Sequence, residues 1–341
     1  MKLIIRLIFV FLTIILIGLI TYQQNRATKN MTTSKSQNIN TQQLIFQLNR
    51  SEKELYQRNP GIFASEESGY GPGFLRPNVN PNKIPQINVI LLDEHGQYVF
   101  HWKGFTDIRL VQDSNYPELQ VSSFLGTLPD INSEDKTYSY DNYEKIYQQA
   151  MKDKKYQKIL DEMDEKTNLK LYTQYREILK ILKLYGWKTY IPLVGNNLDP
   201  SGYPNTRGGY PRILGEDSWR LYKEELGNYP NVPDGYYIDS YEKWNKYVRR
   251  KEMGSSIHAI FYKDNLILDL FLSDTYTDIN IETNTASYLY RYDEKTRGEK
   301  WREYLAADIP KWQAKRKQAE DELKAKGYHI DETYVDAPLP K

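Results

Sequence analysis

The sequence predicts an α+β fold, in which antiparallel hairpins and a short meander pack with several helices, together with one N-terminal transmembrane helix. Strand-like runs follow one another in blocks, and helix-like segments do the same. A doubly wound sheet would instead need strict alternation of strands and helices. The transmembrane helix is predicted because an almost pure hydrocarbon run begins at residue 7.

The hydrocarbon run covers residues 7–20, and we predict a membrane anchor over residues 7–22. A spanning helix needs about 20 apolar residues, a length that is reached if residues 3–5 also enter the bilayer and Arg6 extends its guanidinium to the headgroups. A cleaved secretory signal is the alternative, but the run is not followed by the pair of small residues that signal peptidase requires. The large apolar side chains of the anchor include Leu7, Phe9, Phe11, Ile14, Leu16 and Ile20.

The orientation of the anchor depends on the size of the body that follows it. Basic residues flank the anchor on both sides, so the positive-inside rule is nearly balanced, whereas long domains translocate largely regardless of charge. We therefore expect residues 1–6 to form a cytoplasmic head at the inner membrane of a bacterium, with the C-terminal body in the periplasm or outside the cell. Residues 23–43, rich in Asn, Gln, Thr and Ser, are expected to form a flexible stalk.

Residues 44–85 are predicted to hold a short helix and a linker. Apolar residues recur near every 3.6 positions over residues 44–56, which indicates a helix. Gly and Pro are dense over residues 61–85 and interrupt regular structure there. The body, residues 86–341, is large enough for one lobe, or for two lobes that divide near residue 195.

Apolar periodicity predicts six strands and five helices in the body. The strands cover residues 87–92, 98–102, 108–111, 187–194, 256–262 and 266–272, and the last two form a hairpin. The helices cover residues 141–163, 169–185, 217–226, 241–252 and 298–326. Pro192 restricts its strand to a sheet edge, and Pro310 is expected to kink or divide the last helix.

Composition excludes several classes of site. Lys and Arg number 46 against 45 Asp and Glu. The chain therefore lacks the excess of positive charge that is typical of a nucleic-acid-binding protein. The chain has no cysteine, which excludes disulfides, thiolate metal sites and a cysteine nucleophile. The segment Gly69–Gly73 is not a nucleotide loop, because Pro72 interrupts it and no strand precedes it. We therefore predict no metal, cofactor, nucleotide or nucleic acid, and expect the partners to be an envelope protein and the lipid bilayer.

Tyrosine–proline pairs beside Gly or Asn recur in the body. Proline holds the preceding residue in extended geometry, so such loops can present aromatic rings to a partner with little entropy left to lose, and arginines among them can bind a carboxylate. In the alternative, each ring packs back onto the core and fixes its loop. The candidate partner-binding residues are Tyr203, Arg207, Tyr210, Arg212, Tyr229 and Tyr236.

Asp269 is the candidate catalytic residue. It sits in the middle of a predicted strand, on the face opposite Leu268 and Leu270, and that face is either solvent or the wall of a cleft. A glycosidase would need a second carboxylate about 5–10 Å away. Without such a neighbour, Asp269 is an ordinary surface charge.

These observations favour a non-enzymatic, membrane-anchored binding protein that engages a protein partner in the bacterial envelope. Neutralisation of an incoming toxin, as by an immunity protein, is one such role. Two alternatives remain. One is a hydrolase of envelope glycan or peptidoglycan that uses paired carboxylates, and the other is a scaffold subunit of an inner-membrane complex.

Overall fold

The computed structural model of the chain describes residues 42–60, 62, 74–75, 87–93, 95–112, 121–128, 140–194, 209–224, 233–249, 255–274, 276–289 and 300–340. The predicted head, the anchor with Leu7, Phe9, Phe11, Ile14, Leu16 and Ile20, and nearly all of the stalk lie outside these residues. Within the described ranges, no helix combines the length and the apolar character needed to cross a bilayer. Residues Thr41–Lys341 form one compact unit.

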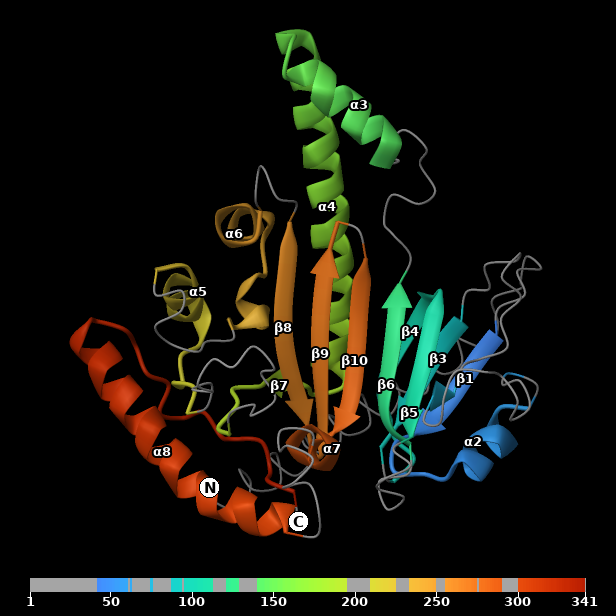
Figure 1. The fold of residues 1–341 in the computed structure, drawn as a ribbon, viewed down its shortest axis with the longest axis vertical. Coiled ribbons are helices and arrows are strands. Elements are labelled where there is room, and N and C mark those ends of the chain that lie inside the picture. The colour runs from blue at the N-terminus through green and yellow to red at the C-terminus, as the bar shows by residue number, and fades with distance from the viewer. Residues whose placement is uncertain are drawn as a thin grey trace, which may run out of the picture. The chain divides into compact units, whose positions relative to one another are not determined.

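The described part of the chain is mixed α+β, as predicted (Figure 1). The strands are β1 (Gln42–Gln47), β2 (Phe74–Leu75), β3 (Ile87–Leu92), β4 (Tyr98–Phe105), β5 (Asp107–Gln112), β6 (Val121–Leu128), β7 (Lys188–Thr189), β8 (Ser256–Lys263), β9 (Leu266–Ser273) and β10 (Thr277–Thr283). The helices are α2 (Glu52–Arg58), α3 (Tyr140–Ala150), α4 (Lys154–Leu184), α5 (Gly215–Glu224), the 3-10 turn η3 (Gly235–Tyr237), α6 (Tyr241–Tyr247), α7 (Asn284–Leu289) and α8 (Trp301–Ala325).

The strands form two sheets. The first has three strands in the order β1-β3-β4, and the second has seven in the order β2-β5-β6-β10-β9-β8-β7. The predicted hairpin is present as β8 and β9, with Asp264 in the left-handed conformation of the turn (φ 52°). The predicted strand at Pro192 is reduced to β7, which pairs with β8 at the edge of the sheet.

The structure replaces the first half of the helix predicted at residues 44–56 with a strand. Strand β1 pairs in parallel with β3, and Leu44 lies opposite Val89. Leu44 and Phe46 are both fully buried, because alternate side chains of a strand face one side. Helix α2 starts only after Ser51, whose hydroxyl accepts a hydrogen bond from the Glu54 backbone amide, while the Glu54 carboxylate accepts one from the Ser51 backbone amide. This capping box satisfies backbone donors at the helix start.

Helix α4 packs its apolar side against the core. The two helices predicted at residues 141–163 and 169–185 are instead α3 and the longer α4, separated at residues 151–153. Asp153 ends the separation, because its side chain caps α4 by accepting a hydrogen bond from the Lys155 amide. Leu171, Tyr175 and Ile178 are completely buried in the main core cluster. Figure 1 shows α4 behind β9 and β10, so it covers one face of the seven-stranded sheet.

One hydrophobic core joins the two sheets. Phe46 of the small sheet stacks on Phe124 of the large sheet at 5.2 Å between ring centroids, and Phe105 meets Phe124 edge-on at 5.4 Å. A Cβ atom at Gly126 would lie 2.5 Å from both the Phe105 and the Phe124 rings. Glycine at this position therefore makes room for the aromatic contact.

Helix α8 remains a single helix through Pro310, so the proline does not divide it. Gly209 has a φ of +66°, and a Cβ atom there would lie 2.6 Å from the Trp312 carbonyl oxygen and 2.7 Å from the Arg316 amide nitrogen. Only glycine lets this segment approach the α8 backbone so closely. Arg316 is buried and donates hydrogen bonds to the Tyr210 carbonyl (2.7 Å) and to Asp336 (2.7 and 2.8 Å).

Candidate functional site

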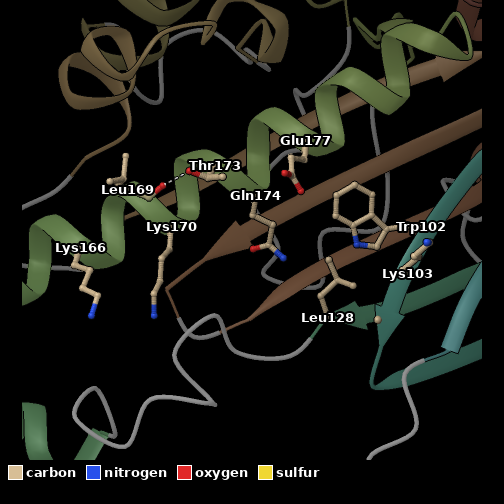
Figure 2. Close-up of a pocket in the computed structure, with 10 residues that line it drawn as sticks. Trp102, Lys103, Leu128, Lys166, Leu169, Lys170, Thr173, Gln174 and Glu177 are labelled. Atoms are coloured by element: carbon tan, nitrogen blue, oxygen red, sulfur yellow. Dashed lines mark hydrogen bonds between the residues drawn. The ribbon is translucent and has the colours of Figure 1, made fainter. Parts of the chain in front are cut away.

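A groove of about 710 Å³ lies between α4 and the strands β4 and β6, and we call it the α4 groove (Figure 2). Helix α4 supplies one wall, and β4 with the end of β6 supplies the other. Its lining residues are Trp102, Lys103, Gly104, Leu128, Lys166, Leu169, Lys170, Thr173, Gln174 and Glu177. A concave surface of this size that combines apolar with polar side chains is typical of a binding site.

The α4 wall of the groove follows directly from helical periodicity. Lys166, Lys170, Thr173 and Glu177 recur at three- and four-residue steps, which places them on one side of a helix. Thr173 points its hydroxyl back to the Leu169 carbonyl, at 2.8 Å. The buried residues of α4, such as Leu171, Tyr175 and Ile178, occupy other helical positions, so one helix contributes to both the core and the groove.

A second hollow of about 450 Å³ continues the groove toward the start of α4. It is lined by Lys158, Asp161, Glu162, Glu165, Lys166 and Leu169. Lys166 and Leu169 line both hollows, so the recessed surface is continuous from Lys158 to Glu177, or about 29 Å at the usual helical rise. Carboxylates dominate its first half and ammonium groups its centre.

Exposed apolar side chains also gather on α3 and α4. Leu169 is 50% exposed at the junction of the two hollows, and Met151 is 71% exposed between the two helices. Tyr147 on α3 and Ile159 on α4 are also exposed. Of these side chains, Leu169 lines both hollows, and an exposed apolar side chain in a groove is characteristic of an interaction surface.

A half-buried polar pair joins α3 to α4. The Tyr143 hydroxyl donates to the Asp164 carboxylate at 3.3 Å. Burial, together with the nearby Asp164 charge, raises the pKa of Tyr143 to about 12. Burial also raises the pKa of Asp164, although the hydrogen bond from Tyr143 and the charge of Arg249 act in the opposite direction. The α3–α4 contact thus holds a carboxylate that is removed in part from water.

A smaller hollow of about 310 Å³ opens on the face of the large sheet that α4 does not cover, and we call it the sheet-face hollow. Its lining residues are Asp107, Arg109, Leu125, Gly126, Thr127, Asp269, Phe271, Asp278, Ile279 and Asn280. The strand register brings them together, since Leu125 pairs with Asn280 and Asn280 pairs with Asp269. Asp269 therefore lines a concave surface.

Asp269 has both a histidine and a second carboxylate near it. His258 Nε2 lies 2.7 Å from Asp269 Oδ1, and this hydrogen bond raises the pKa of His258, against the effect of burial. Asp278 accepts a hydrogen bond from the Thr127 hydroxyl at 2.8 Å. Asp278 pairs with Phe271 in the register, so Asp278 and Asp269 are diagonal neighbours, roughly 7–8 Å apart between Cα atoms.

Arg212 already binds a carboxylate of its own chain. Its guanidinium makes two hydrogen bonds of 2.8 Å to the two oxygens of Glu320, and its backbone amide adds a third of 3.0 Å. The hydrogen bonds that Arg212 donates to Glu320 raise the pKa of Arg212. A partner's carboxylate would have to displace Glu320, so this geometry assigns Arg212 to the docking of α8.

The ring of Tyr236 packs onto the core and is not presented to a partner, which was the alternative considered for these loop tyrosines. Its ring contacts Phe261 edge-on at 4.9 Å, and its hydroxyl donates to the Trp187 carbonyl at 2.9 Å. Burial raises the pKa of Tyr236 well above its ordinary value. Tyr210 is half-buried, and its backbone is bonded to Arg316 and Pro192.

Tyr203, Arg207 and Tyr229 lie outside the described residues. The candidate loop residues are therefore not brought together into one surface by the described part of the chain. Across that same part, no group of three or more His, Asp or Glu side chains could hold a metal ion.

The groove was not predicted from sequence, although two separate helices were predicted over most of the length of α4. Leu169 is an apolar residue on the charged side of the helix, and this interruption is the local signal that could have marked it. Trp102 and Leu128 reach the groove only through the sheet topology.

No protein-family model matches the chain, and the comparisons with curated proteins and with solved structures found no match.

Proposed function

We propose that the chain is a membrane-anchored, envelope-facing binding protein without enzymatic activity, and that it binds a protein partner through α3 and α4. Toxin neutralisation, as by an immunity protein, is the role we assign to it. The recessed surface along α4, with Leu169 exposed at its centre, is the observation that carries the proposal. A helix that packs one side against the core and exposes a leucine in a groove on another side is suited to recognition of a partner.

The predicted anchor and stalk complement this surface. An anchor at residues 7–22 and a polar stalk would hold the body close to the membrane. The Tyr–Pro loops are a second surface for the same function. Their described members, Tyr210, Arg212 and Tyr236, already contact their own chain, so α4 is the stronger candidate.

The test is co-purification of partners from envelope extracts with the full chain. Leu169→Asp is expected to reduce recovery of a specific partner at least about tenfold, since a carboxylate at the centre of an interface is costly. Leu184→Asp is the matched control, because Leu184 is also on α4 and is 76% exposed but lines neither hollow. A triple change of Tyr203, Arg207 and Tyr210 to Ala measures how much the Tyr–Pro loops contribute to the recovery of partners.

The recovered partner then tests the toxin-neutralising role. Export of that partner to the envelope should arrest growth, and co-expression of the wild-type chain, but not of Leu169→Asp, should restore it. Equal recovery of partners by wild type and Leu169→Asp would show that the α4 groove is not the binding surface. Growth that the partner does not affect would remove the immunity role.

A second candidate function, hydrolysis of an envelope glycan, is favoured by the pair Asp269 and Asp278 in the sheet-face hollow. Both carboxylates lie on one face of the sheet as diagonal neighbours, and glycosidases use two carboxylates that flank the scissile bond. Release of sugar from peptidoglycan by the wild type, lost in Asp269→Asn, would replace the binding proposal with this one.

A further inference from the structure

The α4 groove is lined by more positive than negative charge. Among the described residues that line it, Lys103, Lys166 and Lys170 contribute ammonium groups, and Glu177 contributes the one carboxylate. Lys166 and Lys170 lie four residues apart on α4, and their side chains leave the helix on the same side (Figure 2). Like charges at this spacing oppose helix formation, so helix stability does not explain the pair. A ligand that brings negative charge would be attracted to this part of the surface.

A β-bulge in β4 brings consecutive residues to the opposite wall of the groove. The pairing between β3 and β4 shifts register here, so that Lys103 and Gly104 lie together opposite Asn88. Gly104 has a φ of 89°, a conformation that glycine adopts readily. Consecutive side chains of a regular strand face opposite sides, whereas a bulge redirects them and is common beside functional sites. Trp102, Lys103 and Gly104 therefore all border one groove.

Apolar surface lies beside these charges. Trp102 is half-buried and packs against the main core cluster, which holds its ring in place at the groove. Leu169 is 50% exposed on the α4 wall. An indole has a large apolar face and an N–H group that can donate to a carboxylate. The groove thus offers apolar contact and positive charge together.

The length and the surroundings of the groove limit its ligand. From Lys166 to Glu177 the groove runs about 16 Å along α4, a length that an extended segment of about five residues covers. Beyond Lys166, the second hollow is lined by Asp161, Glu162 and Glu165. These carboxylates would repel a longer acidic segment, so the complementary ligand is both acidic and short.

We propose that the α4 groove binds a short acidic segment of the protein partner, whose carboxylates contact Lys166 and Lys170 and one of whose apolar side chains packs on Trp102. This inference rests on the binding function proposed above and specifies the chemistry of the partner. Lys103 adds positive charge at the opposite wall. Charge complementarity of this kind selects a partner and speeds its association.

The probe is a fluorescein-labelled peptide of about five residues, made of glutamates with one central phenylalanine. Its binding to the purified full chain in a non-ionic detergent is measured by fluorescence anisotropy in about 0.15 M salt, where exposed charges more than about 8 Å apart are largely screened. A peptide with glutamines in place of the glutamates should bind at least about tenfold more weakly. Replacement of the phenylalanine by alanine should weaken binding at least about threefold.

Lys170→Glu should weaken binding of the glutamate peptide at least about fivefold, because a carboxylate replaces one of the ammonium groups of α4. Lys180→Glu is the matched control. It makes the same charge change on the same helix, at an exposed position that lines neither hollow and lies about 15 Å further along the helix. It should change the Kd less than about twofold, and the thermal midpoints of the two variants should agree.

Reversal of the charge separates ligand binding from a structural role. When Lys166→Glu and Lys170→Glu are combined, carboxylates outnumber ammonium groups in the lining. This variant should bind a lysine version of the peptide at least about fivefold more tightly than the glutamate version, which is the opposite of the wild-type preference. A lysine pair that only supports the fold would produce no such gain.

Several results would overturn the proposal. They are no binding of the glutamate peptide to the wild type, equal Kd values for the glutamate and glutamine peptides, equal losses in Lys170→Glu and Lys180→Glu, and no reversal in the double variant. Displacement of the peptide by an equal concentration of glycerol phosphate, the soluble headgroup of an anionic phospholipid, would assign the groove to a membrane surface instead. Self-association of the wild type that Lys170→Glu abolishes, measured by light scattering, would assign it to a second copy of the chain.

Co-purification from envelope extracts distinguishes failure of this inference from failure of the proposed function. Lys170→Glu is expected to reduce recovery of the partner at least about fivefold, as Leu169→Asp also does, whereas Lys180→Glu is not. Loss of the partner in Leu169→Asp alone, with full recovery by Lys170→Glu, would keep the binding function and overturn the acidic segment. Equal recovery by the wild type and Leu169→Asp would contradict the function, while the peptide titration would still measure the charge preference of the groove.

Discussion

At the scale of single residues, His258 is the group through which pH acts on the sheet-face hollow. Its imidazole is half-exposed and bonded to Asp269, and that bond raises the pKa of His258 above its ordinary value of 6.5. When the His258 imidazole is protonated, its positive charge neutralises Asp269. The protonation state of one histidine is thereby linked to the charge of the hollow.

Asp269→Asn is expected to lower the pKa of His258, because the carboxylate that stabilises the imidazolium is removed. The raised folded-state pKa contributes stability that is fully present below pH 6.5 and is lost as the pH rises through the folded value. Asp269→Asn should therefore cost more stability near pH 6 than near pH 8. An NMR titration of the histidine rings measures the pKa directly.

His101 provides the control in the same spectra. Burial, and then the charge of Lys103, lower the pKa of His101, and Asp269 is not among the causes. Its titration should stay in place in Asp269→Asn. A His258 curve that also stays in place would show that the contact with Asp269 does not control the imidazole.

At the scale of elements, α8 depends on a few charged residues that anchor its inner side. Glu320 and Arg316 are each 5% exposed on α8 and bind Arg212 and Asp336, respectively. Loss of one partner from such a pair leaves an uncompensated charge, which costs more than the pair itself contributes. The docking of the helix therefore depends on positions that a charge pattern alone would assign to solvent.

Glu320→Ala should reduce the free energy of unfolding by about 3 kcal/mol. Asp321→Ala is its neighbour and control, because Asp321 only pairs with Lys317 in solvent, with side chains 58% and 74% exposed. Exposed pairs contribute about 0.2–1 kcal/mol. Urea unfolding measures the free energy of unfolding of both variants. Losses of equal size in Glu320→Ala and Asp321→Ala would mean that Glu320 does not anchor α8.

At the scale of the whole molecule, the two sheets share one core and should unfold together. Phe124 belongs to the large sheet but contacts both Phe46 and Phe105 of the small sheet. Trp187, just after α4, donates a hydrogen bond of 2.6 Å to the Val99 carbonyl of β4. These contacts couple the small sheet, the large sheet and α4.

Phe124→Ala should destabilise the whole body by about 3–5 kcal/mol, with protection from hydrogen exchange lost in both sheets at once. Leu184→Ala is the control, because its side chain is largely exposed and surface changes usually alter stability by less than about 0.5 kcal/mol. Loss of protection confined to the large sheet would show that the two sheets unfold independently.

The sequence alone determined the elements whose signals are local. The β8–β9 hairpin, α5, α6 and the extent of α8 follow from apolar periodicity and turn residues, which act over a few neighbouring positions. The same reasoning was wrong at residues 44–47, because these residues belong to β1 and its partner is β3, about 45 positions away. Pairing over that distance leaves no local pattern in the sequence.

Only the tertiary structure decided how the candidate site is composed. Trp102 and Leu169 share a groove, and Asp269 and Asp278 share a hollow, because strand register and helix packing bring distant segments together. The sequence predicts Arg212 to be available to a partner's carboxylate, yet its guanidinium binds Glu320, 108 positions further along the chain. The physical reason is that periodicity fixes which side of an element a residue occupies, whereas long-range packing fixes what that side meets.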